Sequence, residues 1–193
     1  MIPQRNISML SNRLASGRRI PAGVLERDYC LAWFLAVSAE SDLRTPLALK
    51  GGTALKRCYF GDYRFSEDLD FTLVEAIPLD NILHRLEQVY EAIRESSGIV
   101  FAFEREDRQE HANSYTFYLG YTGPLPVGND VKVDITVRGR LVFPLEQRPL
   151  LRGCDEFTDL PAGRLVQAYS LEEVVDEKTI ALESGAQRTA RRL

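Results

Sequence analysis

Two aspartates at alternate positions, Asp68 and Asp70, are the first residues whose type and spacing could do chemistry. They lie in the segment RFSEDLDFTL, where apolar and polar residues alternate as in a half-buried strand. Residues i and i+2 of a strand face the same side, about 7 Å apart, so both carboxylates could reach one divalent cation. A solvated strand face with ordinary surface acids is the alternative, and it would be preferred if this pair stood alone.

A second strand-like segment, DVKVDITV at 130–137, repeats the pattern. Its apolar residues alternate with polar ones that include Lys132 and Asp134. If the two segments are neighbours in a sheet, Asp134 joins Asp68 and Asp70 in an oxygen-rich set of the kind that magnesium prefers. Lys132 is either a neutralising neighbour of Asp134 or a contact for phosphate, and the two interpretations are equally supported.

The glycine pair Gly51-Gly52 stands ahead of the acidic segment and opens a helix-like stretch, TALKRCYF. Glycines at the entry of a helix let phosphate oxygens approach free backbone N–H groups at the positive end of the helix dipole. Thr53 would add a hydroxyl donor. Neither a P-loop nor a G-x-G-x-x-G motif occurs, so a tight turn is the alternative. The position of the glycine pair before the aspartates favours the phosphate-binding interpretation.

Arg64 precedes the acidic pair and is a candidate for contact with a triphosphate. It could instead pair with Asp68 or Glu67, and this structural role is slightly favoured.

Lys178 lies in the expected C-terminal helix, which follows the capping box SLEE at 170–173. The apolar stripe of that helix consists of Leu171, Val174, Val175, Ala181 and Leu182. Lys178 falls within this stripe, and an inward lysine needs a counter-charge or a route to water. We therefore expect its ammonium group to point into the cleft of the acids, where either a triphosphate or one of the carboxylates would neutralise it.

The elements that must position these residues alternate between helices and strands. Helices are predicted at 24–40, 53–60 and 80–95 and after residue 170. Strands are predicted at 46–50, 67–73, 99–103, 114–121 and 130–137. The pattern predicts a mixed sheet that carries the acids around one cleft, with a helix that begins at Gly52 facing it.

Composition is that of an ordinary soluble globular protein, with 193 residues of which 45% are hydrophobic and 27% charged. A formal net charge of −4 argues against general coating of nucleic acid but is compatible with a local basic patch. Cys30, Cys58 and Cys154 lack C-x-x-C spacing, which argues for reduced thiols and against a zinc site. No signal peptide or membrane-spanning run is evident, so we expect a cytoplasmic protein without a membrane partner.

Taken together, these residues resemble the nucleotidyltransferase superfamily and, within it, the AbiEii/AbiGii toxin family. The matching segments are ERDY at 26–29, KGGTAL at 50–55, RFSEDLDF at 64–71, KVDI at 132–135 and EVVDEK at 173–178. The combination of Gly-Gly-Thr with R-F-S-x-D-L-D-F is far more specific than any single piece, and the resemblance covers about residues 24–183. The RDLYDL-like sequence of the family's final motif has no counterpart here, where RTARRL stands instead.

The resemblance implies an α/β (α+β) nucleotidyltransferase fold with a mixed, mostly antiparallel sheet flanked by helices. It implies an N-terminal helical segment over residues 1–45, packed on a nucleotidyltransferase core over residues 46–165. Residues 166–193 would be the start of a helical C-terminal region that is either truncated or naturally short.

The same resemblance assigns roles to the candidate residues. The catalytic residues would be Asp68, Asp70, Asp134 and Lys178, and the three aspartates would hold Mg²⁺ or Mn²⁺. The nucleotide-binding residues would be Gly51, Gly52, Thr53, Arg64, Ser66 and Lys132.

The implied reaction moves a nucleoside monophosphate from a nucleoside triphosphate to an acceptor hydroxyl, with pyrophosphate leaving. In such a family the chain would be the toxin of a toxin–antitoxin or phage abortive-infection system, with tRNA as one candidate acceptor and a cognate antitoxin as partner. One alternative is a non-catalytic module of the same fold that binds a nucleotide or a partner protein. Another is an antibiotic-modifying nucleotidyltransferase with a small acceptor.

Overall fold

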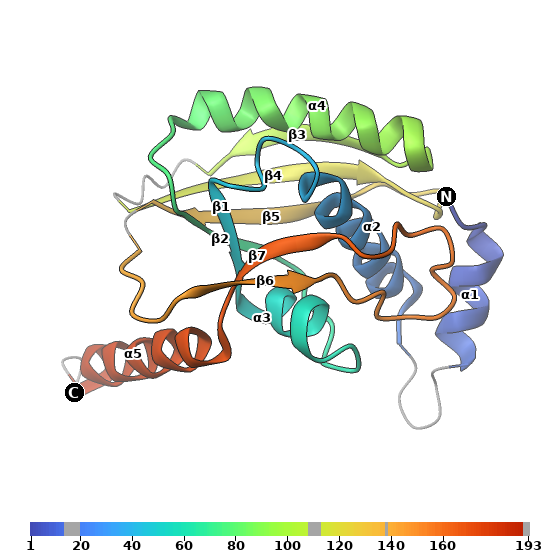
Figure 1. The fold of residues 1–193 in the computed structure, drawn as a ribbon. Helices are drawn as coiled ribbons and strands as arrows, with labels where there is room; N and C mark the ends of the chain where they lie inside the picture. The colour runs from blue at the N-terminus through green and yellow to red at the C-terminus, as the bar shows by residue number, and fades with distance from the viewer. Residues whose placement is uncertain (14–19, 108–112, 138, 191–193) are drawn as a thin grey trace.

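Seven strands form one sheet in the computed structural model, which describes residues 1–13, 20–107, 113–137 and 139–190 (Figure 1). The strands are β1 (Leu47–Lys50), β2 (Leu69–Leu73), β3 (Val100–Glu106), β4 (Ser114–Thr122), β5 (Asn129–Thr136), β6 (Leu145–Pro149) and β7 (Leu165–Tyr169). Their order across the sheet is β3-β4-β5-β2-β1-β7-β6. The pairs β1–β7 and β2–β5 are parallel and the other neighbours antiparallel, which confirms the expected mixed, mostly antiparallel sheet.

Helices flank this sheet. They are α1 (Gln4–Arg13), α2 (Ala22–Ser38), α3 (Gly51–Ala54), α4 (Leu79–Ser97) and α5 (Leu171–Ala190), and α3 runs directly into a π-helix, η1 (Leu55–Tyr59). The predicted helices at 24–40 and 80–95 correspond to α2 and α4. α4 follows Pro78 and stops at Gly98, whose φ of 78° lies in the left-handed region that glycine adopts without a steric penalty. α2 and α4 pack against each other, and α4 lies on β3 (Figure 1).

The alternation expected of the two acid-bearing strands is present in β2 and β5. Their apolar residues are buried in the core. The strands pair in parallel with Leu69 opposite Val133 and Asp70 opposite Asp134. Directly paired residues point to the same side of a sheet, so Asp70 and Asp134 lie side by side on the face turned away from the core.

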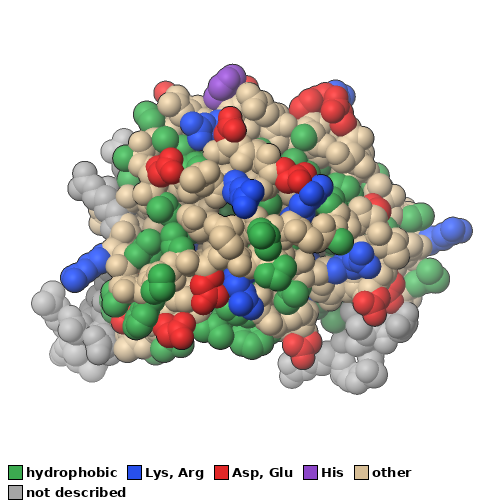
Figure 2. Space-filling model, viewed as in Figure 1, with side chains coloured by type: hydrophobic (Ala, Val, Ile, Leu, Met, Phe, Trp, Pro, Cys, Tyr) green, Lys and Arg blue, Asp and Glu red, His purple; other side chains and the backbone are tan. Residues whose placement is uncertain are grey.

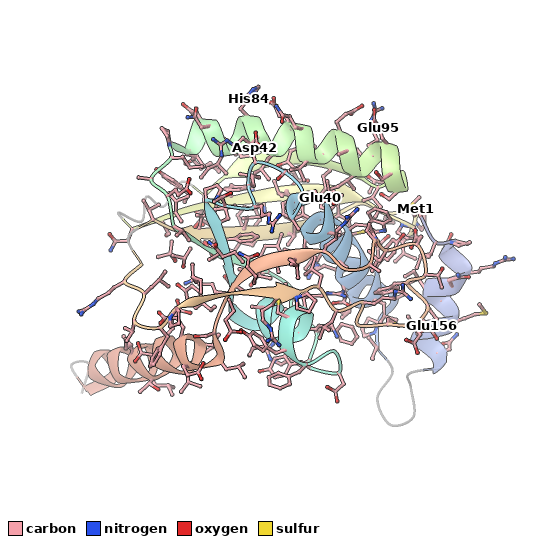
Figure 3. All side chains as sticks on the ribbon, viewed as in Figure 1. Met1, Glu40, Asp42, His84, Glu95 and Glu156 are labelled. Atoms are coloured by element: carbon pink, nitrogen blue, oxygen red, sulfur yellow. The ribbon has the colours of Figure 1, made fainter. Side chains whose placement is uncertain are left out.

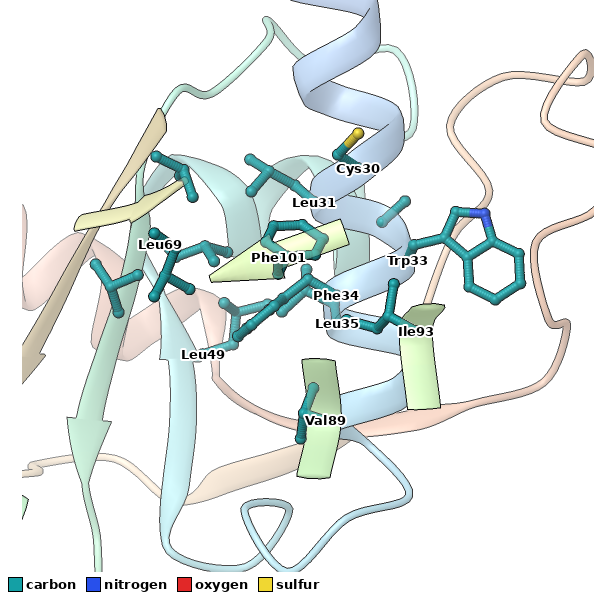
Figure 4. Close-up of a cluster of buried hydrophobic side chains, with 14 of the residues drawn as sticks. Cys30, Leu31, Trp33, Phe34, Leu35, Leu49, Leu69, Val89, Ile93 and Phe101 are labelled. Atoms are coloured by element: carbon teal, nitrogen blue, oxygen red, sulfur yellow. The ribbon is translucent and has the colours of Figure 1, made fainter. Parts of the chain in front are cut away.

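The core fills the space between one face of the sheet and helices α2 and α4. α2 is buried along most of its length, as is typical of a helix that is apolar on nearly all sides. Phe34 of α2 and Phe101 of β3 place their ring centroids 5.6 Å apart. Leu49 of β1 and Leu69 of β2 belong to the same cluster (Figure 4). The first acid-bearing strand thus contributes to the same core as α2.

Polar side chains of the ERDY segment attach α2 to loops that are distant in sequence. Glu26 accepts a hydrogen bond from the backbone N–H of Leu125 at 2.6 Å. The hydroxyl of Tyr29 donates to Asp159 at 2.6 Å. Burial raises the pKa of Glu26, while the hydrogen bond from Leu125 opposes that shift. These contacts give the ERDY segment a structural role.

A buried ion pair joins Asp28 of α2 to Arg57 of η1. The two side chains are 5% and 1% exposed, and the closest oxygen and nitrogen are 2.8 Å apart. Arg57 also donates to the backbone carbonyls of Asp28 at 2.6 Å, of Leu151 at 3.3 Å and of Arg152 at 2.6 Å. A Cβ on Gly153 would lie 2.8 Å from Nη1 of Arg57, so glycine lets the loop close over the guanidinium group. One side chain therefore joins α2, η1 and this loop.

The apolar stripe expected in the C-terminal helix is mostly exposed. Val174 is buried, whereas Leu171 is 37%, Val175 64% and Leu182 74% exposed. Lys178 is exposed as well. The reason is that α5 extends away from α2 and α4, so these helices do not cover its apolar stripe (Figure 1). The prediction that Lys178 points inward along a buried stripe is therefore wrong.

The predicted capping box at the start of α5 is half formed. The hydroxyl oxygen of Ser170 accepts a hydrogen bond from the N–H of Glu173 at 3.3 Å, as expected of an N-cap. The carboxylate of Glu173 accepts instead from the N–H groups of Val142 and Phe143, at 3.0 and 2.7 Å. Glu173 thereby attaches the start of α5 to the loop before β6.

The sequence-based prediction omits β6 and β7. β6 is an edge strand with the sequence LEQRP, which shows no apolar alternation because neither of its faces is deeply buried. Pro149 is tolerated there, since an edge strand has one unpaired side. β7 extends the sheet to Tyr169, immediately before α5 begins.

The surface carries charges of both signs, which are interspersed over the face seen in Figure 2. His84 and Glu95 point outward from α4 (Figure 3). Cys30, Cys58 and Cys154 are free thiols, in agreement with the sequence-based expectation. Across the described ranges, none of the helices combines the length and apolar character that a membrane span requires.

We expect Arg57→Met to lower the free energy of unfolding by about 3–5 kcal/mol, because the substitution leaves the Asp28 carboxylate buried without its counter-charge. Urea denaturation would measure the loss. Arg94→Met is the matched control, because Arg94 pairs with Glu91 on the exposed side of α4 and such pairs contribute little. Similarly small losses in both variants would contradict a stabilising role for the buried pair.

Candidate active site

A row of polar side chains crosses the sheet at the level of Asp70. Lys50 of β1 lies opposite Asp70 of β2. Asp70 in turn lies opposite Asp134 of β5, and Asp134 opposite Thr116 of β4. Paired residues share a face of the sheet, so these four side chains are neighbours on the face turned away from the core. Asp68 stands just before β2 on the same side as Asp70.

Neighbouring carboxylates influence the pKa values of Asp68 and Asp70. Burial raises the pKa of Asp70; the charge of Lys50 opposes this shift, and the charges of Asp134 and Asp68 add to it. Burial likewise raises the pKa of Asp68, opposed by Lys132 and reinforced by Asp134. Like charges in one place favour a bound cation. The structure thus places the three aspartates on one face of the sheet, as the alternation indicated.

Asp134 is held by two neighbours. The ammonium group of Lys132 lies 2.6 Å from one of its oxygens, and the hydroxyl of Thr116 donates to the other. The hydrogen bond to Asp134 raises the pKa of Lys132. Of the two interpretations of Lys132, the structure therefore shows the neutralising neighbour.

Gly51 and Gly52 approach the functional side chains closely. Gly51 has a φ of 69°, and a Cβ at this position would overlap the carboxylate of Asp70. At Gly52 a Cβ would lie 3.0 Å from the hydroxyl oxygen of Ser66 and 3.7 Å from a terminal nitrogen of Arg64. Glycine is thus needed at position 51 for its conformation and for space. Arg64 and Ser66, both expected nucleotide-binding residues, therefore lie close to Gly52 at the start of α3.

Thr53 has a different role from the one expected. Its side chain is 2% exposed, and its hydroxyl donates to the backbone carbonyl of Asp68 at 2.6 Å. That donor is therefore engaged inside the protein, because the chain returns from η1 to β2 directly over Thr53. The expectation that the Thr53 hydroxyl contacts phosphate is wrong; the hydroxyl holds Asp68 in place.

Arg64 also differs from expectation. Glu67 pairs with Arg27 of the ERDY segment at 2.9 Å, because α2 runs close to the loop before β2. Arg64 lies instead with its guanidinium carbon 5.9 Å from the ring centroid of Tyr63, near Gly52. The slightly favoured pairing of Arg64 with Asp68 or Glu67 is therefore not among the ion pairs of the described residues.

Lys56 of η1 organises the loop that carries Arg64 and Ser66, although the sequence did not indicate such a role. It is 3% exposed, and it donates to the backbone carbonyls of Gly61 at 3.3 Å and Tyr63 at 3.2 Å. Burial lowers its pKa. A π-helix holds more residues per turn than an α-helix, and here both Lys56 and its neighbour in sequence, Arg57, are buried.

Lys50 is a further charged residue of the site, and its role is not evident from the sequence. Its ammonium group forms an ion pair with Glu177 of α5 and lies 5.8 Å from the ring centroid of Tyr169. The signal in the sequence is its place as the first residue of the segment KGGTAL, just before Gly51. Glu177 lies 127 positions further along the chain, and this separation explains why no local pattern reveals the pair.

Among the described residues, no group of three histidine, cysteine or acidic side chains is arranged to hold a metal ion. The expected site of Asp68, Asp70 and Asp134 is therefore not preassembled. Lys132 and Thr116 hold Asp134, and Asp70 lies against Gly51. The donor set nevertheless consists of carboxylate oxygens on one face of a sheet, and such ligands fit Mg²⁺ or Mn²⁺.

The model of the family "Nucleotidyl transferase AbiEii toxin, Type IV TA system" matches residues 33–192. The chain belongs to this AbiEii family. The match includes the Gly-Gly turn and all three aspartates, whereas the ERDY segment precedes it. No curated protein matches the chain.

Among solved structures, the AbiEii-family chain is similar to MenT4, a nucleotidyltransferase toxin from Mycobacterium tuberculosis H37Rv, with a TM-score of 0.62 and 17% sequence identity. The similarity covers 93% of this chain and 58% of MenT4, so the chain spans little more than half the length of that protein. It shows that the fold is that of a nucleotidyltransferase toxin.

Gly51→Ala should destabilise the protein more than Gly98→Ala does. Both glycines have a positive φ, but a Cβ at Gly98 would meet no atom within 4 Å. We expect Gly98→Ala to cost about 1–2 kcal/mol from backbone strain alone, and Gly51→Ala about 1–3 kcal/mol more because Asp70 must move. Urea denaturation of both variants provides the comparison; equal losses would show that Asp70 moves aside freely.

Proposed function

We propose that this AbiEii-family protein is a cytoplasmic toxin that transfers a nucleoside monophosphate from a nucleoside triphosphate to an acceptor hydroxyl. The observation that carries the proposal is the pairing of Asp70 with Asp134, next to Asp68 and directly against the Gly51 turn. Carboxylates and a glycine turn in one place suit a triphosphate and its cation. Family membership supports the same chemistry.

A divalent cation, Mg²⁺ or Mn²⁺, would be held by Asp68 and Asp70, with Asp134 as the third carboxylate. Bound there, it supplies positive charge to the attacking and leaving oxygens of the displacement. Lys132 would then leave Asp134 and contact an oxygen of the triphosphate. In the nucleotide-bound site it would therefore be a contact for phosphate, which is the second interpretation of this residue.

The triphosphate would lie at the start of α3. The backbone N–H groups of Gly51 and Gly52 would donate to the phosphates, and so would the side chains of Arg64 and Ser66, which lie next to Gly52. Lys178 would reach the nucleotide from solvent, because its neighbour Glu177 already contacts Lys50 at the edge of the site. These donors would offset negative charge on the leaving pyrophosphate.

Asp134 would orient the acceptor hydroxyl and take its proton. Thr116, whose hydroxyl donates to one of its oxygens, restricts its orientation, as a general base requires. The acceptor that we favour is tRNA, and the partner is a cognate antitoxin of a type IV toxin–antitoxin system, with phage abortive infection as the biological setting. The alternative acceptor is the hydroxyl of a small molecule, and the transfer assay below distinguishes it from tRNA.

Mg²⁺ or Mn²⁺ should raise the melting temperature of the wild-type protein, because the cation relieves repulsion among the three carboxylates. Asp70→Asn should abolish most of this gain. Asp130→Asn is the matched control, since Asp130 lies on β5 but pairs with Arg105 at 2.9 Å away from the row. Calorimetric scans with and without metal test the prediction, and an unchanged gain in Asp70→Asn would remove Asp70 from the metal site.

Label should pass from an α-³²P-labelled nucleoside triphosphate to tRNA when the protein, Mg²⁺ and total tRNA are incubated together. We expect Asp70→Asn to reduce the rate of transfer at least about a hundredfold, which is the decrease expected when an electrostatic contact to the transition state is lost. Asp130→Asn should retain the transfer activity. Transfer only to small hydroxyl compounds would favour an antibiotic-modifying enzyme. Nucleotide binding without transfer to any acceptor would favour the non-catalytic module.

A further inference from the structure

Lys50 occupies a position where an ammonium group must have a counter-charge. It is the last residue of β1, lies directly opposite Asp70 and immediately precedes Gly51. Its side chain is 12% exposed, and a charge at that depth is costly unless it is paired. The Gly51 turn, where we place the phosphates, is therefore preceded by a mostly buried cation.

The partner of Lys50 comes from a different part of the chain. Glu177 of α5 forms the ion pair and is 37% exposed, so solvent and ligands can reach it. The ring of Tyr169 lies beneath Lys50. Tyr169 is itself held, because its hydroxyl hydrogen-bonds that of Thr72 at 2.5 Å and its carbonyl accepts from Tyr59 at 2.6 Å. This fixed ring leaves Lys50 between Glu177 on one side and the Asp70–Gly51 contact on the other.

The charges around the row are unbalanced toward the negative. The row and its neighbours include the carboxylates of Asp68, Asp70, Asp134 and Glu177 and the ammonium groups of Lys50 and Lys132. A cation on the aspartates would weaken the attraction between Asp70 and Lys50. Two groups would then compete for Lys50: the single carboxylate of Glu177 and the more highly charged phosphate oxygens at the adjacent turn.

We propose that Lys50 is a further triphosphate-binding residue and that Glu177 is the counter-ion which the triphosphate displaces. The inference rests on the proposed function, because it assumes a nucleoside triphosphate at the Gly51 turn. The exchange breaks one ion pair and forms another without moving a proton. Glu177 pairs with Lys50 in the absence of nucleotide and competes with the substrate for that lysine.

The test is a double-mutant cycle on nucleotide affinity, measured by isothermal titration calorimetry with ATP, GTP, CTP and UTP in turn in the presence of Mg²⁺. Lys50→Met should weaken binding about 10- to 100-fold, the cost of a lost charge-assisted hydrogen bond. Glu177→Gln should tighten binding about three- to tenfold, because the competitor is removed. In the Lys50→Met background, Glu177→Gln should change affinity less than about twofold, since the two residues act through one contact.

Two controls separate this role from a structural one. Glu172→Gln, at an exposed position in the first turn of α5, should leave affinity unchanged. Lys50→Arg should restore most of the binding lost in Lys50→Met, because the charge is retained. Melting temperatures show whether each variant is folded, and inorganic tripolyphosphate in place of the nucleotides should reproduce the same pattern if the contact is to phosphate.

Other outcomes would overturn the inference. If Glu177→Gln weakens binding, or tightens it equally in the Lys50→Met background, Glu177 acts through the position of α5 and does not compete for Lys50. If the wild-type protein binds a nucleotide and Lys50→Met binds it equally well, Lys50 is not a phosphate contact, while the proposed function stands. If the wild-type protein and both variants bind no nucleotide and transfer no label, the proposed function fails together with this inference.

Discussion

Asp70 and Asp134 lie side by side because β2 and β5 pair in parallel with Leu69 opposite Val133. A shift of one residue in this pairing would turn one strand's carboxylates toward the core and its apolar residues toward solvent. Burial of Leu69 and Val133 opposes such a shift. The same hydrophobic contacts that stabilise the sheet therefore hold the acidic row in register, although the two strands are far apart in the sequence.

The parts of the site that are not on strands depend on buried polar contacts. Lys56 holds the loop that carries Arg64 and Ser66, and Thr53 holds the backbone at Asp68. Next to Lys56 in sequence, Arg57 joins η1 to α2 and to the loop after β6. Because each of these donors is enclosed, loss of any one leaves an unsatisfied partner inside the protein. The site is consequently rigid where the phosphates would bind, and more adaptable at Lys50 and Lys132, whose partners are carboxylates that can be exchanged.

The features that the sequence could predict are those with local periodicity. Alternation in β2 and β5 indicated which face carries Asp70 and Asp134, and the glycine pair indicated the turn. Features set by distant partners were missed or misjudged. Thr53 is enclosed by the returning chain, Lys50 meets a helix from the far end of the sequence, and β6 shows no alternation because it is an edge strand. Lys178 was misplaced because a helical apolar stripe indicates a face and does not show whether anything covers it.

The position of β1 in the sheet has a consequence for the biogenesis of the protein. β1 is an early strand, yet one of its two neighbours is β7, near the other end of the chain. On a ribosome that adds about 5–20 residues per second, β1 can pair with β2 several seconds before β7 has been made. During that interval its other edge is unpaired, and such an edge is a site for aggregation or chaperone capture. A ribosome that stalls before β7 would release a chain with all three aspartates and no complete sheet.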